Sequence, residues 1–240
     1  MRIEARGLTH VGMRRSSNED AFLVREDLGM CTVADGMGGA AAGEVASAFF
    51  MDAALEVFGR ADPLGVAEDL VKNAFFLANG RILDHAGSHP ECSGMGCTAE
   101  ILAVRGDTVV IGHVGDSRTY RFRDGELRQL TVDHSLVQSQ VDSKAITAEQ
   151  ARVHPMRHVI LRAVGIKRDL EVDILKGKAR PGDIFLLCSD GLTDMIEDVE
   201  IAACLSPPRR LDDMARDLVD RANRAGGKDN VTVVLAVVLP

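Results

Sequence analysis

Hydrophobic and polar positions along this chain follow two different patterns, one typical of strands and the other of helices. Short apolar runs predict strands at 21–24, 30–34, 98–104, 107–115, 118–130, 183–189 and 230–238. The run 118–130 turns at Asp124-Gly125, which is a strong hairpin signal. Apolar residues spaced three or four positions apart predict helices over 44–58, 63–85 and 211–225.

The runs 183–189 and 230–238 are apolar on both faces, and such strands are usually covered from both sides. With long helices toward both ends, they predict sheets packed against each other with helices outside. The short connections favour antiparallel pairing. No linker and no repeat interrupts the chain, so we expect a single domain over 1–240. The polar stretch 131–169 lacks long apolar runs, so we expect it to cross the surface.

Composition narrows the functional class. With 46% hydrophobic and 27% charged residues, the chain is typical of soluble globular proteins. Its net charge of −8 and aromatic share of 4% argue against nucleic acid or an anionic membrane as the main partner. No stretch approaches the ~20 apolar residues of a membrane span, and the first residues lack the apolar segment of a signal peptide. The five cysteines form no Cys-x-x-Cys pair, and Cys31 and Cys188 lie in apolar runs, so we expect buried thiols and a reducing, cytoplasmic location.

Acidic residues stand at the boundaries of the predicted strands. They are Asp35, Asp116 and Asp190 after strands, and Glu19, Asp20 and Asp229 before strands. In antiparallel sheets the end of one strand lies beside the start of its neighbour, so these acids can converge on one rim. For Asp35-Gly36 or Asp190-Gly191 alone, an ordinary turn is the better interpretation. Six uncompensated carboxylates repel one another, and this weakens the turn interpretation for the set.

A bound cation resolves such repulsion. Oxygen ligands without clustered Cys or His point to hard divalent ions such as Mg²⁺ or Mn²⁺. Several carboxylates, with Asp35 able to bridge, suggest two ions about 3.5–4 Å apart, an arrangement used for attack on phosphorus. Arg15, just before Glu19, can offer a bidentate fork to phosphate oxygens. A solvated surface arginine is the competing interpretation.

The motifs resemble, in order, those of the metal-dependent serine/threonine phosphatases of the protein phosphatase 2C (PPM) family. The matching segments are "GMRRSSNED", "VADGMGGAAAGEVAS", "MGCT", "HVGDSRTYRFRDGELRQLTVDHSLV", "HPMRHVILRAVG", "GDIFLLCSDGLTD" and "GGKDNVTVVL". They run from about residue 8 to 238 and are most similar to the compact bacterial branch. The resemblance implies an α+β fold, a four-layer αββα sandwich of two antiparallel sheets flanked by helices, with the metal site at one edge.

The resemblance also implies roles for individual residues. By position, Asp35 bridges two Mn²⁺ or Mg²⁺ ions. Glu19 and the Gly36 carbonyl complete the protein ligands of one ion, and Asp190 and Asp229 bind the other. Asp20 acts through water. Asp116, Asp190 and Asp194 match a weaker third metal site found in some members, and Arg15 matches the residue that binds the substrate phosphate. The segment 134–165 matches the mobile flap of the family. The glycines of "GMGGAAAGE" lack the lysine of a nucleotide loop, so we expect them to let the backbone turn beside the metals.

The chain departs from the family pattern at two places. Met37 stands where many eukaryotic members have the histidine proposed as general acid, so a metal-bound water is the expected proton donor. The alternatives are His113, His134, His154 and His158. Of these, His113 is predicted to be a core residue and His134 a structural partner of a helix N-terminus. Lys144 stands in the flap where glycine is common, which leaves the flap conformation open.

The leading hypothesis is a monomeric Mn²⁺- or Mg²⁺-dependent phosphatase of phosphoserine and phosphothreonine proteins that opposes a bacterial Ser/Thr kinase. One alternative is a pseudophosphatase that binds phosphoproteins without turnover. The presence of all the metal acids, Asp35 and Asp190 among them, counts against it. Another alternative keeps the chemistry but takes a sigma-factor regulatory protein as substrate, and the sequence does not separate it from the first.

Overall fold

The computed structural model describes residues 1–38, 42–62 and 65–240. Its strands are β1 (Arg2–His10), β2 (Asp20–Arg25), β3 (Met30–Met37), β4 (Gly96–Cys97), β5 (Ala99–Arg105), β6 (Thr108–Val114), β7 (Arg118–Arg123), β8 (Glu126–Gln129), β9 (Asp173–Lys178), β10 (Ile184–Cys188) and β11 (Val231–Leu239). Its α-helices are α1 (Ala42–Gly59), α2 (Ala67–Ser88), α3 (Leu136–Asp142), α4 (Ala148–Arg152), α5 (Asp190–Thr193), α6 (Asp198–Leu205) and α7 (Leu211–Arg224).

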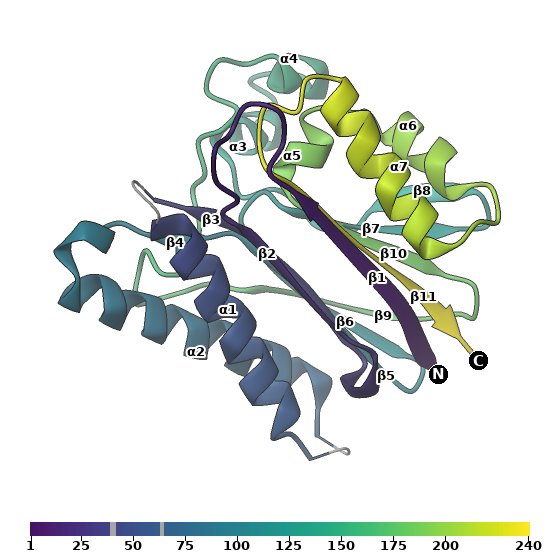
Figure 1. The fold of residues 1–240 in the computed structure, drawn as a ribbon, viewed down its shortest axis with the longest axis horizontal. Coiled ribbons are helices and arrows are strands. Elements are labelled where there is room, and N and C mark those ends of the chain that lie inside the picture. The colour runs from purple at the N-terminus through teal and green to yellow at the C-terminus, as the bar shows by residue number, and fades with distance from the viewer. Residues whose placement is uncertain (39–41, 63–64) are drawn as a thin grey trace.

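The strands form two sheets in which all neighbours are antiparallel. One sheet has the order β1-β11-β10-β7-β8, and the other has the order β2-β3-β5-β6-β9 with β4 beside β3. Figure 1 shows α1 and α2 on one side of the pair of sheets, and α6 and α7 on the other. The predicted α+β sandwich of four layers is confirmed.

Three clusters of buried side chains lie at the three interfaces of these layers. Phe50 of α1 and Phe75 of α2 meet edge to face, 4.9 Å between ring centroids, over the β2–β9 sheet. Phe185 and Leu187 of β10 face the space between the sheets, whereas Leu186 faces α5 to α7. Because β10 and β11 are covered on both sides, their sequences are apolar at consecutive positions. The predicted burial of Cys31 and Cys188 is also confirmed, and both are fully buried.

The predicted elements agree with the observed ones within a few residues. Helix 44–58 corresponds to α1 and helix 211–225 to α7, and the predicted hairpin turns at Asp124-Gly125 between β7 and β8. The helix predicted for 63–85 corresponds to α2, which begins at Ala67, and its predicted first residue Pro63 lies outside the described residues.

Besides the helices within 131–169, the described elements β1, β4, β9, α5 and α6 have no counterpart in the sequence predictions. Strand β1 did carry a signal, because Ile3 and Ala5 are buried and alternate with polar neighbours. Strand β9 is an edge strand with mostly exposed side chains, so it lacks an apolar run. The stretch 131–169 is less irregular than expected, since it contains α3 and α4, capped by the side chains of Ser135 and Thr147.

Lys144 follows α3 in a left-handed conformation, with φ of 61°. Its amide donates to the carbonyl of Val141 at 2.9 Å, a hydrogen bond that closes the helix C-terminus. A side chain with a Cβ is disfavoured in this conformation, so we expect Lys144→Gly to raise the free energy of unfolding by about 0.5–1 kcal/mol. Urea unfolding measures the change, and Lys144→Ala, which keeps the Cβ, is the control expected to bring no gain. A loss of stability in the glycine variant would contradict the prediction.

Among the described residues, no helix combines the length and the apolar composition that crossing a bilayer requires.

Candidate active site

A cleft of about 470 Å³ opens where strands of both sheets begin or end. Sheet β2–β9 supplies Asp35 near the end of β3, and the other sheet supplies Asp190 after β10 and Asp229 before β11. The predicted site residues that line this cleft are Arg15, Glu19, Asp35, Gly36, Asp116, Asp190, Asp194 and Asp229. The structure therefore brings together acids that are far apart in the sequence.

Asp20, the remaining predicted acid, lies behind the cleft. It is directly opposite Asp35 in the register of β2 and β3, as expected for antiparallel neighbours. Its Oδ2 accepts hydrogen bonds from the hydroxyls of Ser189, at 2.8 Å, and Thr232, at 2.6 Å. These two hydroxyls come from the other sheet, so Asp20 links the two sheets below the cleft.

The acids of the cleft crowd one another in a poorly solvated place. Burial, followed by repulsion from Asp20, Asp190, Asp116 and Asp229, raises the pKa of Asp35 well above its ordinary value. Burial and the other acids likewise raise the pKa of Asp190. Burial is also the main reason why the pKa of Asp20 rises to about 6 and that of Asp116 to about 7.

Two carboxylate oxygens of this group are buried and have no hydrogen-bond partner: Oδ1 of Asp20 and Oδ1 of Asp190. Buried polar atoms in native proteins are almost always paired, so such atoms point to a missing partner. The donor set consists of oxygens alone, which suits Mg²⁺ or Mn²⁺ rather than a soft metal. The residues present therefore fit divalent cations.

Gly36 permits a very close approach of backbone segments beside the acids. Its amide donates to the Glu19 carbonyl at 3.1 Å, and a Cβ at Gly36 would lie 2.0 Å from the Gly43 carbonyl oxygen. A Cβ at Gly43 would lie 2.1 Å from Oε2 of Glu19. Both positions therefore need glycine because the space is filled by neighbouring backbone and by the Glu19 carboxylate. The turn expected between them passes through 39–41, which lie outside the described residues.

The sequence profile described as Protein phosphatase 2C matches residues 6–236, nearly the whole chain. The chain belongs to the protein phosphatase 2C family. Among curated relatives, the serine/threonine protein phosphatase PstP of Mycobacterium tuberculosis is 40% identical over 228 residues, which are 95% of this chain but 43% of PstP. The chain thus spans less than half of that relative. The serine/threonine phosphatase stp of Listeria welshimeri is 36% identical over 233 residues, 95% of this chain and 92% of stp.

Solved structures of 2C-type phosphatases superpose over the entire chain. The crystal structure of M. tuberculosis PstP has a TM-score of 0.94 and 37% identity, and it covers 100% of both chains. A PstP catalytic domain in complex with two manganese ions has a TM-score of 0.92 and 36% identity, covering 100% of this chain and 99% of that one. Stp1 from Staphylococcus aureus has a TM-score of 0.94 and 34% identity, with coverage of 100% and 96%.

Arg15 reaches the cleft of this 2C-type chain from the loop that precedes β2. Its Nη2 donates to Oδ2 of Asp229 at 2.7 Å, and its side chain stays half exposed. This hydrogen bond to Asp229 raises the pKa of Arg15. The guanidinium therefore stands beside the acids with N–H groups still open toward the cleft.

Arg157 lines the cleft but was not predicted from the sequence as a site residue, and it lies next to His158, which the sequence offered only as an alternative proton donor. Arg157 forms an ion pair with Asp194, 3.1 Å between Nη1 and Oδ2, and Nδ1 of His158 lies 3.6 Å from the same oxygen. His158, Asp190 and Asp194 each offer a ligand atom within 4.8 Å of the others. No spacing rule joins the sequence around 157 to that around 194, so the contact depends on the path of the segment 134–165.

The four histidines considered as proton donors have different surroundings. His158 lines the cleft, as Met37 does. His154 accepts a hydrogen bond from the Met156 amide at 3.1 Å. The prediction for His134 was wrong in its partner, because Ser135 caps α3 and the His134 ring instead accepts from the Gly115 amide. His113 is a core residue, as predicted.

His113 forms a buried ion pair with Glu100 between the strands β5 and β6. Its Nε2 donates to the Val132 carbonyl at 2.9 Å, and its Nδ1 contacts Oε1 of Glu100, whose other oxygen accepts from Thr119. Burial alone lowers the pKa of His113, but the attraction of Glu100 and these hydrogen bonds outweigh it and raise the pKa to about 8.

This raised pKa predicts how stability depends on pH. The folded state keeps a proton on His113 that the unfolded chain releases near pH 6.5, so the free energy of unfolding falls as pH rises from about 6.5 to 8, by up to about 2 kcal/mol. Urea unfolding of the Mn²⁺-loaded protein at these pH values measures the slope. His113→Gln is expected to flatten it, and an equal slope in the variant would assign the proton to another group.

Proposed function

We propose that this member of the family hydrolyses phosphoserine and phosphothreonine in proteins with two divalent cations, Mn²⁺ or Mg²⁺. The observation that carries the proposal is the pair of buried, unpartnered carboxylate oxygens of Asp190, in the wall of the acidic cleft, and of Asp20, behind it. A 2C-type structure that covers this chain throughout is described as a complex with two manganese ions, which supports the same conclusion.

The residues that would hold two cations are Glu19, Asp35, the Gly36 carbonyl, Asp190 and Asp229, with Asp20 acting through water, and Asp116 and Asp194 would hold a weaker third one. When bound, such cations lower the pKa of water and neutralise phosphate oxygens. The chain's own residues prepare the cleft. Ser189 and Thr232 fix the orientation of Asp20 by donating to one of its oxygens.

Arg15 would bind the phosphate of the substrate. One of its Nη groups is held by Asp229, and the remaining N–H groups suit two phosphate oxygens. Met37 lines the cleft without a titratable group, so it donates no proton to the leaving serine or threonine oxygen. Of the histidines proposed as alternatives, His158 is the one in the cleft wall.

The proposal extends to the segment that covers the cleft, the class of substrate, the cellular location and the oligomeric state. We infer that segment 134–165 acts as a flap, because Arg157, His158 and Ile160 contribute to the cleft wall. Relatives in several bacteria carry the name serine/threonine phosphatase, which supports phosphoproteins made by a bacterial Ser/Thr kinase as substrates. The free cysteines support a reducing, cytoplasmic location. The chain is proposed to act as a monomer.

Phosphate release from a phosphothreonine peptide, with Mn²⁺ and with a chelator, tests the proposed function. We expect turnover only with the cation, and little from a phosphotyrosine peptide of the same sequence. Binding of the phosphothreonine peptide without any phosphate release, in Mn²⁺ or Mg²⁺, would instead support a phosphoprotein-binding role.

A further inference from the structure

The bend between β6 and Asp116 depends on one glycine. Gly115 has φ of +114°, a conformation that other residues rarely adopt, and a Cβ there would lie 2.5 Å from the Cβ of Thr98. The antiparallel pairing of β6 with β5 ends one residue earlier, at Val114. The amide and carbonyl of Gly115 therefore need hydrogen-bond partners outside the sheet.

His134 supplies both partners. The Gly115 amide donates to Nδ1 of His134 at 3.0 Å, and the His134 amide donates to the Gly115 carbonyl at 2.7 Å. Since Nδ1 accepts, a neutral ring carries its proton on Nε2. That nitrogen lies 3.2 Å from Oδ2 of Asp173 and 3.1 Å from Nη1 of Arg162. Of these two neighbours only the carboxylate can accept its proton.

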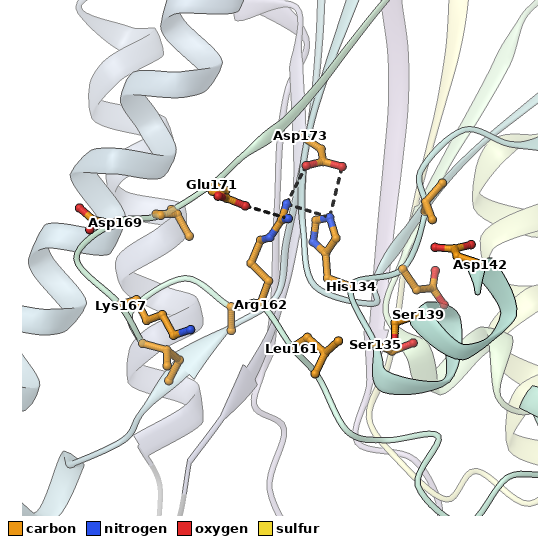
Figure 2. A pocket seen from close by; sticks show the side chains of 15 residues that line it. His134, Ser135, Ser139, Asp142, Leu161, Arg162, Lys167, Asp169, Glu171 and Asp173 are labelled. Atoms are coloured by element: carbon orange, nitrogen blue, oxygen red, sulfur yellow. Dashed lines mark hydrogen bonds and ion pairs between the residues drawn. The ribbon is translucent and has the colours of Figure 1, made fainter. Parts of the chain in front are cut away.

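The Nε2 side of the His134 ring also has partners, Asp173 and Arg162. Figure 2 shows Asp173 and Arg162 beside the ring in the wall of a second cavity, of about 550 Å³. Arg162 donates to Oδ1 of Asp173 at 2.7 Å and thereby fixes the acceptor of the histidine. The His134 carbonyl accepts from the Leu161 amide at 2.7 Å.

The surroundings of His134 favour the neutral form of its ring. Burial, followed by the neighbouring charge of His113, lowers the pKa of His134 to about 4. The two rings lie 4.4 Å apart between centroids. A neutral ring keeps Nδ1 available as the acceptor for the Gly115 amide.

The residue that follows this clamped glycine is Asp116, whose side chain is 8% exposed. Asp116 lines the cleft and also the adjoining cavity of about 260 Å³ beneath α3 and α4. The direction of its carboxylate follows from the Gly115 backbone, because the Gly115 carbonyl that His134 holds belongs to the peptide group bonded directly to Asp116. We propose that His134 is a positioning residue, which orients Asp116 in the active site by holding Gly115 through two hydrogen bonds.

The effect of His134 on turnover rests on the proposed function, whereas its hold on Gly115 does not. The first measurement therefore does not use activity. Hydrogen exchange of the Gly115 amide is measured by NMR in the cation-free protein. Asparagine places an acceptor where Nδ1 lies, whereas glutamine places its amide near Nε2. We expect exchange to be at least about 10-fold faster in His134→Ala and His134→Gln, and close to the wild-type rate in His134→Asn.

The second readout is the Mn²⁺ dependence of the same variants. Partners that orient a metal ligand typically contribute about 10–100-fold to affinity, so the weakest Mn²⁺ site, measured by calorimetry, is expected to weaken by that factor in the alanine and glutamine variants. In the alanine and glutamine variants kcat is expected to fall together with the Mn²⁺ affinity, whereas KM for the phosphopeptide stays within about 2-fold. His134→Asn is expected to restore both the Mn²⁺ affinity and kcat. His89→Ala, at an exposed histidine beyond the end of α2, is the matched control.

The outcomes are distinguishable. Unchanged exchange of Gly115 in the alanine and glutamine variants, or an asparagine variant as impaired as alanine, would overturn the positioning role. A wild type that shows no turnover would refute the proposed function, and the exchange and calorimetry would still decide the role of His134.

Discussion

Replacing Asp35 with asparagine is expected to lower the rate of phosphopeptide hydrolysis by at least about 1,000-fold while making the cation-free protein more stable. Activity falls because the variant loses the carboxylate proposed to bridge two cations. Stability rises because burial and the four neighbouring acids hold the pKa of Asp35 well above its usual value, so its charge is unfavourable in the folded state. Each kcal/mol gained raises Tm by about 2–4 °C in a domain of this size.

Phosphate release in Mn²⁺ and calorimetric Tm in EDTA measure the two effects on the same preparation. Asp52→Asn, the same exchange at an exposed position of α1, is the matched control and is expected to change neither quantity. Asp190→Asn should behave as Asp35→Asn does, since the pKa of Asp190 is raised by the same causes. A variant within tenfold of wild-type activity would contradict the bridging role, and a lower Tm in EDTA would contradict the repulsion.

Binding of cations is expected to stabilise the protein strongly. A ligand at 100 times its Kd contributes about 2.7 kcal/mol per site, so two occupied sites contribute about 5 kcal/mol and raise Tm by about 10–20 °C. Differential scanning calorimetry in Mn²⁺ and in EDTA measures this difference. A difference below a few degrees at saturating Mn²⁺ would show that the acids do not bind cations tightly in the native state.

The difference between Tm in Mn²⁺ and Tm in EDTA is expected to widen as pH rises. Burial raises the pKa of Asp20 to about 6 and that of Asp116 to about 7, so without cations the folded state binds more protons than the unfolded chain from about pH 4 to 7. The free energy of unfolding of the cation-free protein therefore falls as pH increases through this window. Tm in EDTA at pH 5, 6 and 7 measures the slope, and Asp20→Asn is expected to reduce it. A cation-free Tm that rises over this range would contradict the assignment.

The position of the acids in the strand pattern predicted where they meet. Asp20 precedes an apolar run and Asp35 ends the next one, so antiparallel pairing had to place them opposite each other, as the register of β2 and β3 does. Such reasoning works because the backbone of a sheet fixes the relation between the ends of neighbouring strands. It needs only the boundaries of the apolar runs.

Contacts made by side chains across layers were not predictable in this way. The hydroxyls of Ser189 and Thr232 reach Asp20 from the other sheet, and their distance depends on how the two sheets pack. The pairing of Arg157 with Asp194 depends on the course of the flap. His134 was expected to serve its own helix, because sequence proximity favours local partners, whereas its actual partner Gly115 lies 19 residues earlier.

The pairing of β1 with β11 has a consequence for folding kinetics. β1 lies at the edge of its sheet, with β11 as its neighbour, and Arg2 is opposite Leu239. Closing a loop of this length is slow, so we expect this ladder to form late in folding. Asp229 lies two residues before the first residue of β11, so the acidic cleft is complete only after that step. Cations that bind the finished cleft therefore slow unfolding and leave the folding rate unchanged.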